Sequence, residues 1–284
     1  MKICKTIDEV RKEVKQYRKE GLSVGLVPTM GYLHEGHKSL IDKAVAENDI
    51  IIVSDFVNPT QFGPNEDLAD YPRDLEKDAM LCDNAKVDIL FAPKPEEMYA
   101  SNGCTFVTVD GLTNELCGKS RPIHFRGVAT VVSKLFNIVT PDRAYFGEKD
   151  AQQLAVIRRM VKDLNFNIEI IGCPIVREED GLAKSSRNKY LNEEERLEAI
   201  VLHRALVLGK EAVAGGEADA SKVKELIVDM INSESLSKID YVEIVDAETI
   251  QPVSIIEGPI LCALAVSFGN TRLIDNFSYD NEEK

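Results

Sequence analysis

Residues 25–40 read GLVPTMGYLHEGHKSL, and this stretch decides the fold. The short apolar run at 23–27 is typical of a buried strand, and we expect Pro28 to end it. A glycine-rich turn follows, and a helix is predicted from Gly36 to Glu47. A buried strand that leads through such a turn into a helix is the opening unit of a parallel α/β sheet.

The same alternation continues on both sides of this stretch. A capping box at Thr6 and Glu9 predicts an earlier helix that ends at Gly21. Further buried strands are predicted at 50–57, 87–91, 143–146 and 167–171, and further helices at 74–85, 126–139 and 150–163. Continuous apolar strands that alternate with helices predict an α/β fold, a Rossmann-like doubly wound parallel sheet with helices on both faces.

The pattern changes in a polar stretch around residues 172–192. Two helical segments follow at about 193–214 and 221–234, and then strands at 241–245, 260–267 and 272–277. The pair Gly269-Asn270 between the last two strands is a two-residue hairpin signal. We therefore expect two domains, a Rossmann-like domain over residues 1–175 and a smaller C-terminal α+β domain over residues 176–284.

The composition excludes several classes of function. The chain has 284 residues and a net charge of −14, which argues against non-specific nucleic-acid binding. The charge is −10 from Val176 onward and −4 before it, so the N-terminal part suits small anionic substrates better. No apolar stretch approaches the ~20 residues that cross a bilayer. Six scattered cysteines without a C-x-x-C pair predict reduced thiols and a cytoplasmic location.

Two histidines mark the candidate site. His34 and His37 lie three residues apart where the predicted strand gives way to the helix. Ligands bind at the carboxyl ends of parallel strands, and a helix N-terminus offers free N–H groups to phosphate. A Walker P-loop, a zincin and a pair of helix-capping histidines are alternatives, but His37 interrupts the first motif and the spacing does not fit the second. H-x-G-H at this position resembles the signature of the nucleotidylyltransferase superfamily.

Three further polar segments belong to the candidate site. Residues 184–187 (KSSR) place two cations and two hydroxyls in a row, which suits phosphate oxygens, although a solvated loop is the alternative. Lys149 stands at a predicted helix start, where an anionic ligand would favour a cation. Gln61 lies in the loop 58–64, and its amide donates and accepts at once, which suits a substrate with carboxylate and hydroxyl groups.

Together these segments resemble the pantothenate synthetase (pantoate–β-alanine ligase) family. The resemblance covers the chain through residue 192. It rests on four motifs in order, which are VPTMGYLHEGH at 27–37, FVNPTQFGPNEDLADYPR at 56–73, FRGVATVVSKLFNIV with PDRAYFGEKDAQQL at 125–154, and PIVREEDGLAKSSRNKYL at 174–191.

The resemblance implies an AMP-forming ligase that joins pantoate and β-alanine, with Mg²⁺ on the ATP and a homodimeric assembly. The first domain would bind ATP and pantoate, and the second would act as a lid. His37, His34 and Lys149 would be catalytic, Gln61 and Gln153 would bind pantoate, and Gln61 would also bind β-alanine. The implied ATP-binding residues are Met30, Gly31, Tyr32, Leu33, His34, Glu35, Gly36, His37, Gly147, Glu148, Lys149, Asp150, Val176, Lys184, Ser185, Ser186 and Arg187. No Mg²⁺ ligands are assigned.

Chemistry supports a two-step reaction. A carboxylate is a poor electrophile, so pantoate must first attack the α-phosphorus and form a pantoyl-adenylate before the amine attacks. Another nucleotidylyltransferase, or a nucleotide sensor without catalysis, would share the histidine motif but would not release AMP with β-alanine. Two residues depart from the family pattern, which is apolar at both positions: Lys184, and Asp55 within a predicted strand, where an unpaired carboxylate is costly. We expect the loop 184–187 to be mobile until ATP binds, because its polar composition predicts few apolar contacts.

Overall fold

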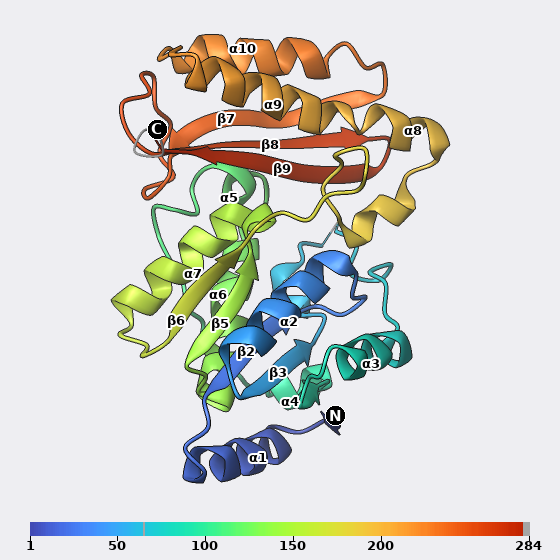
Figure 1. Cartoon of the computed structure of the whole chain (residues 1–284), viewed down its shortest axis with the longest axis vertical. Coiled ribbons are helices and arrows are strands. Elements are labelled where there is room, and N and C mark those ends of the chain that lie inside the picture. The colour runs from blue at the N-terminus through green and yellow to red at the C-terminus, as the bar shows by residue number, and fades with distance from the viewer. Residues whose placement is uncertain (65, 281–284) are drawn as a thin grey trace. The chain divides into compact units, whose positions relative to one another are not determined.

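A parallel sheet of six strands organises the first part of the chain (Figure 1). The structure is a computed structural model that describes residues 1–64 and 66–280, so Asn65 of the second motif and the last four residues of the predicted C-terminal domain lie outside it. The strand order is β1-β4-β3-β2-β5-β6. The strands are β1 (Lys2–Cys4), β2 (Val24–Thr29), β3 (Ile50–Asp55), β4 (Ile89–Phe91), β5 (Arg143–Gly147) and β6 (Glu169–Cys173).

Helices cover both faces of this sheet. They are α1 (Ile7–Lys19), α2 (Glu35–Glu47), α3 (Leu75–Asn84), α4 (Pro95–Met98), α6 (His124–Val139) and α7 (Ala151–Asp163). Val27, Val53 and Tyr145 point to one face and pack with Leu40 and Ile41 of α2. The residues that alternate with them along the strands point to the other face, where α6 packs against β2 and α1. The predicted α/β class is confirmed.

A three-stranded antiparallel sheet organises the second part. Its order is β7 (Ser237–Asp246), β8 (Ile260–Phe268) and β9 (Thr271–Tyr279), and β8 and β9 are joined at Gly269-Asn270 as predicted. The helices α9 (Val201–Ala214) and α10 (Ala220–Ile231) pack against each other and against this sheet (Figure 1). The shorter helices are α5 (Leu116–Ser120) and α8 (Glu193–Glu198).

Three local predictions differ from the structure. Strand β1 is too short to show in the apolar pattern, and a turn at Ala199 and Ile200 divides the predicted helix 193–214 into α8 and α9. The prediction that Pro28 ends the strand is wrong, because β2 continues to Thr29. Thr29 carries the hydrogen bond to β3, so Pro28 faces the other side, where the pairing of β2 with β5 has already ended at Leu26.

The chain divides into two compact units. Unit 1 comprises residues 1–109, 121–148 and 156–174, and unit 2 comprises residues 110–120, 149–155 and 175–284. Two short pieces of the sequence before residue 175 thus belong with the C-terminal sheet. Within the described ranges, 1–64 and 66–280, no helix is long and apolar enough to span a membrane.

Candidate active site

The histidine motif lies at the switch point of the parallel sheet. The chain leaves β2 towards β3 and β4, and then returns to β5 on the other side of β2. Residues 30–37 follow β2, and Gly147 is the last residue of β5. The carboxyl ends of two neighbouring strands with divergent connections form a crevice where α/β proteins bind ligands. The sheet therefore brings two of the four sequence motifs to one edge of unit 1.

The two histidines cap helix α2 and fix each other. The backbone N–H of Gly36 donates to Nδ1 of His34 at 3.1 Å, and the backbone N–H of His34 donates to Nδ1 of His37 at 3.3 Å. The ring centroids are 4.1 Å apart. Because a nitrogen that accepts a hydrogen bond carries no proton, each neutral ring bears its proton on Nε2. The capping alternative is thus true of the geometry, and it leaves both rings as Nε2–H donors.

The turn in front of His34 is held by a buried carboxylate. Asp78 of α3 is 1% exposed. It accepts the N–H groups of Tyr32 at 2.6 Å and of Leu33 at 2.7 Å. Gly31 and Tyr32 have φ values of 77° and 51°, which lie in the left-handed region. Such a turn points consecutive N–H groups in one direction, where an anion stabilises them.

Asp55, the carboxylate that the sequence places within a predicted strand, lies beside Asp78. It is the last residue of β3, and its side chain forms a hydrogen bond with Asp78. Burial, then the charge of Asp78 and then this hydrogen bond raise the pKa of Asp55 to about 7. Burial also raises the pKa of Asp78, against the backbone N–H groups of Leu33 and Tyr32 and the Asp55 hydrogen bond, which lower it. The partner of the Asp55 carboxyl is therefore a second carboxyl group.

Gln61 is buried and hydrogen-bonded within unit 1. The turn η1 (Pro59–Gln61) is capped by Asn58, and the side chain of Gln61 is 6% exposed. Its Oε1 accepts from Nδ2 of Asn58 at 3.0 Å, and its Nε2 donates to Sδ of Met30 at 3.2 Å. Nδ1 of His124 lies 3.1 Å from the carbonyl oxygen of Gln61. Gln61 is thus linked to Met30, the first residue of the histidine segment.

Apart from Glu148, the remaining predicted residues belong to unit 2. Lys149 lies in η2 (Glu148–Asp150), and its carbonyl oxygen accepts from Nδ2 of Asn276 at 2.9 Å. Gln153 is half-buried on α7, whereas its neighbour Gln152 is 6% exposed and binds the backbone of α5 and of the turn that precedes it. Gln152 is therefore a structural residue, and Gln153 stays a prediction as a pantoate ligand.

The hairpin that precedes the loop 184–187 is anchored by an arginine. Arg177 donates to both carboxylate oxygens of Asp275 at 2.6 and 3.0 Å, and its Nη1 also donates to the carbonyl of Gly181 at 3.1 Å. Leu182 and Ala183 are 2% and 4% exposed. These two residues directly precede the loop 184–187, for which few apolar contacts are expected, and Leu182 belongs to the core of unit 2. Residues Ser186–Tyr190 then form the 3₁₀ helix η3.

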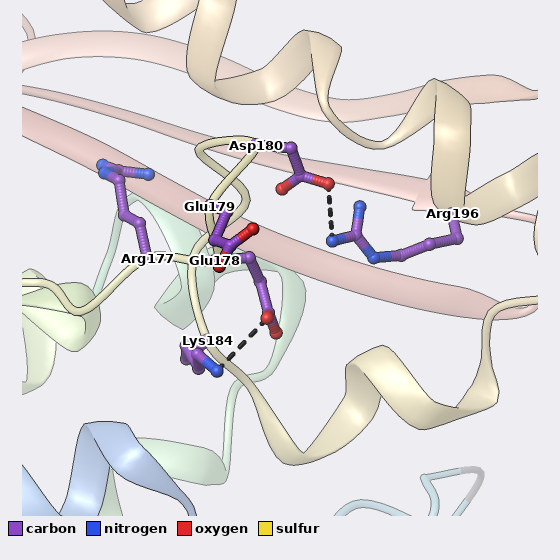
Figure 2. Close-up of a pocket in the computed structure, with 6 residues that line it drawn as sticks. All are labelled: Arg177, Glu178, Glu179, Asp180, Lys184 and Arg196. Carbon is purple, nitrogen blue, oxygen red and sulfur yellow. Dashed lines mark ion pairs between the residues drawn. The ribbon is translucent and has the colours of Figure 1, made fainter.

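A polar pocket of about 460 Å³ lies beside this hairpin (Figure 2). Lys184 pairs with Glu178 at 3.2 Å, and Arg196 pairs with Asp180 at 2.8 Å. The pocket is lined by equal numbers of basic and acidic side chains, which are Arg177, Glu178, Glu179, Asp180, Lys184 and Arg196. An incoming phosphate would therefore compete with Glu178 for Lys184.

The six cysteines are free thiols, as predicted. Five of them are buried, and Cys104 is exposed. In the part of the chain that the structure describes, no three histidine, cysteine or acidic side chains form a group that could hold a metal ion.

Comparison with known proteins identifies the family. The sequence profile of pantoate-beta-alanine ligase matches residues 2–278. The chain belongs to the pantoate-beta-alanine ligase family. It is 62% identical to the pantothenate synthetase of Enterococcus faecalis and 64% identical to that of Clostridium novyi, over 99% and 96% of each chain. The crystal structure of the Thermus thermophilus synthetase superposes with a TM-score of 0.93 at 47% identity, covering 98% of this chain and 99% of that one.

A ligand-bound relative has also been solved. The pantoate-beta-alanine ligase of Francisella tularensis, complexed with beta-gamma ATP and beta-alanine, has a TM-score of 0.82 at 38% identity over 98% of this chain and 97% of its own. The activity of this ligase family, ATP-dependent joining of pantoate and β-alanine to pantothenate with release of AMP and pyrophosphate, is the activity of this chain. The resemblance seen in the sequence is confirmed.

The sequence missed the residues that support the site of this ligase. Asp78, Asn58 and His124 fix the backbone or side chains of predicted site residues that lie 46, 3 and 63 residues away in the sequence. Asn58 before Pro59 was a visible signal, because asparagine before proline favours a capped turn. Asp78 carried no local signal, since its role depends on contact between α3 and the turn after β2.

Gly127 tests how tightly this ligase holds Gln61. A Cβ at Gly127 would lie 2.5 Å from Cα of Gln61 and 2.6 Å from the carbonyl oxygen of Thr60, so Gly127→Ala must displace the turn. We expect a loss of about 1–3 kcal/mol in the free energy of unfolding. We also expect the KM for pantoate to rise above that of the parent by a larger factor than the KM for ATP. Urea unfolding and initial rates measure both. Gly258→Ala is the control, because nothing lies within 4 Å of its Cβ, and an unchanged pantoate KM in Gly127→Ala would contradict the expectation.

Proposed function

We propose that His34 and His37 bind the ATP phosphates and stabilise the charge that develops at the α-phosphorus. The observation that carries this assignment is the pair of backbone N–H groups that occupy both Nδ1 atoms. Each neutral imidazole then has one donor, Nε2–H, in a fixed orientation at the N-terminus of α2. Fixed donors cost no reorganisation during reaction, and this is the main source of electrostatic catalysis.

The rest of the nucleotide site comprises the turn residues Met30 to Leu33, the first helical residues Glu35 and Gly36, Gly147 to Asp150, Val176 and the loop 184–187. Lys149 and Arg187 supply charge to the triphosphate, and Ser185 and Ser186 supply hydroxyl donors. Mg²⁺ arrives with the nucleotide, because it binds phosphate oxygens and water readily and does not need a protein cage. Residues 1–175 carry the pantoate site and most of the ATP site in this proposal. Residues 176–284 supply Val176 and the loop 184–187 and act as the lid.

Pantoate and β-alanine are bound by glutamine side chains. Gln61 holds pantoate and contacts β-alanine, and Gln153 holds pantoate. Gln61 is supported by its fixed amide, whose two ends are oriented by Asn58 and Met30. A fixed amide that presents both a donor and an acceptor distinguishes a hydroxy acid from a simple carboxylate.

The reaction proceeds in two displacements. A carboxylate oxygen of pantoate bonds to the α-phosphorus, and the bond to the β-phosphate breaks and releases pyrophosphate. The β-alanine nitrogen then bonds to the acyl carbon, AMP leaves with the electron pair of the C–O bond, and the nitrogen loses its extra proton to solvent. Positioning and charge stabilisation carry both steps, and no side chain of the protein forms a covalent bond.

The setting of the enzyme follows from the same proposal. Its partners are the small molecules ATP, pantoate and β-alanine, together with a second copy of this chain in a homodimer. It acts in the cytoplasm, which the free thiols support. Nucleic acid and membranes are not among its partners, in keeping with its net charge of −14.

Two glutamine substitutions test the assignment. Gln61→Ala and Gln153→Ala should each weaken pantoate binding by about 1–3 kcal/mol, because a polar group of the substrate loses its partner, while ATP binding changes little. Calorimetry with ATP and with pantoate measures both constants, and Gln251→Ala on the surface is the control. Equal losses for ATP and pantoate would reassign the residues.

The products released distinguish this ligase from another nucleotidylyltransferase. Pyrophosphate should be released without β-alanine, and AMP should be released only with it.

A further inference from the structure

Two carboxyl groups meet beneath the turn that precedes His34. Asp55 ends β3 and Asp78 lies on α3. Carboxylate oxygens of both lie within 3.3 Å of the point where a Cβ of Gly31 would stand, so the two side chains are close enough to share a hydrogen bond. An ionised carboxylate only accepts hydrogen bonds, so two ionised carboxylates cannot form this contact. The pair therefore holds one proton between its two carboxyl groups.

The surroundings place that proton on Asp55. Asp78 accepts two backbone N–H groups, from Tyr32 and Leu33, and such donors favour the ionised form. Asp55 is the group whose pKa is raised to about 7, first by burial and then by the charge of Asp78. Asp55 is thus the neutral donor, and Asp78 is the anion that accepts from three groups.

This anion holds an unfavourable backbone. Tyr32 has a φ of 51°, a conformation that a residue with a side chain rarely adopts without support. Gly31 has no room for a side chain, because a Cβ there would collide with Oδ1 of Asp55 and lie 3.3 Å from Oδ2 of Asp78. The next residues are Leu33, whose N–H Asp78 holds, and His34, the N-cap of α2. Movement of the pair is therefore transmitted directly to His34.

We propose that Asp55 and Asp78 are positioning residues of the ligation, which share a single proton and hold the 31–33 turn so that His34 and His37 face the nucleotide. This inference rests on the proposed function of the two histidines. Loss of the shared proton leaves two like charges in contact, which separates the carboxylates and loosens the turn. The first half-reaction then slows on the alkaline side.

Other ionisable groups around the pair do not account for the alkaline limb of the pH profile. Asp74 and Lys77 lie on or beside α3, and the Lys77 ammonium is 5.1 Å from the centre of the Tyr32 ring. Burial raises the pKa of Cys82 to about 12, so its thiol stays neutral at the pH values of interest. Protonation of either imidazole at Nδ1 would break the capping contacts, but gain of a proton gives the opposite limb of a pH profile from loss of the shared proton.

Asp55→Asn is the decisive variant. Its amide donates to Asp78 at every pH, as the protonated carboxyl does in the parent. In the parent, kcat for pyrophosphate release from ATP and pantoate should fall about tenfold from pH 6 to pH 8, as expected for one group that titrates near pH 7. In Asp55→Asn the ratio of the two rates should be close to one. Asp163→Asn, which removes an exposed carboxylate paired with Arg159, should keep the tenfold ratio of the parent.

Two further measurements separate positioning from folding. Asp78→Asn turns one acceptor into a donor that faces a backbone N–H, so kcat should fall at every pH while the KM for β-alanine changes little. Infrared difference spectra between pH 6 and pH 8 should show a protonated carboxyl band in the parent that is absent from Asp55→Asn. The same alkaline limb in Asp55→Asn and parent, or no such band in the parent, would overturn the inference. A parent that releases no pyrophosphate would overturn the proposed function instead, and the infrared band would still decide whether the proton is shared.

The stability of the fold should follow the same titration. A carboxyl whose pKa is raised in the folded state binds its proton more tightly there than in the unfolded chain. Its contribution to stability is complete below the ordinary carboxyl pKa and is lost as the pH rises to about 7. As the pH rises, the midpoint of unfolding should therefore fall more steeply in the parent than in Asp55→Asn. Equal slopes of the midpoint against pH would also count against the shared proton.

Discussion

Replacing His37 by alanine should lower the rate of adenylate formation by about 10²–10³, the scale for loss of one donor that stabilises developing charge. The same change also removes the acceptor for the His34 N–H, because His37 is the third residue of α2 and completes the capping box. Part of any loss in His37→Ala could therefore arise from an unravelled helix start. Pyrophosphate release from ATP and pantoate measures the rate, and thermal unfolding measures the helix effect.

His37→Gln separates these two contributions. Glutamine at the third position of a helix accepts from the N-cap N–H in ordinary capping boxes, so it replaces the structural role of His37 and not its Nε2–H donor. His34→Asn is the matched change at the N-cap itself, where asparagine is a preferred residue. We expect both variants to keep the unfolding midpoint of the parent and to lose activity as His37→Ala does. Near-normal turnover in these two variants would mean that the histidines only cap α2.

The second large effect concerns the stability of unit 2. Arg177→Met should lower the free energy of unfolding by about 3–5 kcal/mol, since it leaves Asp275 as an unpaired charge with a side chain 1% exposed. It also detaches the hairpin at Gly181, which Arg177 holds through the carbonyl oxygen. The residues 184–187 follow that hairpin, so kcat for the first half-reaction should fall as well. Denaturant unfolding and single-turnover rates give the two quantities.

Two further variants show whether the buried charge is the cause. Arg177→Met with Asp275→Asn removes both charges, so it should recover part of the stability lost in the single variant. Arg159→Met breaks an exposed pair with Asp163 and should change the free energy of unfolding by less than about 1 kcal/mol. A single variant as stable as Arg159→Met would show that the Arg177 pair does not anchor the hairpin.

What the sequence could predict was local. The strand, turn and helix around His34 and His37 form within 25 residues, so their periodicity and glycines indicated both the elements and the candidate site. The Gln61 turn was equally visible, because Asn58 and Pro59 are a local turn signal. These features depend on short-range propensity, which is why the boundaries were nearly correct.

What the sequence could not predict depends on distant partners. Asp55 looked like an isolated buried carboxylate until the packing of α3 brought Asp78 to it. Leu182 and Ala183 looked like part of a polar loop, but both are buried, and Arg177 of the same hairpin pairs with Asp275 of β9. Pro28 looked like a strand end because it has no N–H to donate. That loss matters only if the side of the strand that Pro28 faces has a partner strand.

The distribution of thiols offers an experimental handle on this enzyme. Burial raises the pKa of Cys4, Cys82, Cys173 and Cys262, which suppresses the reactive thiolate, while Cys104 is exposed. A maleimide dye should then attach at Cys104 of unit 1 without prior removal of the other cysteines. A second dye on a cysteine introduced in unit 2 would allow energy transfer to follow the distance between the two units as each substrate binds.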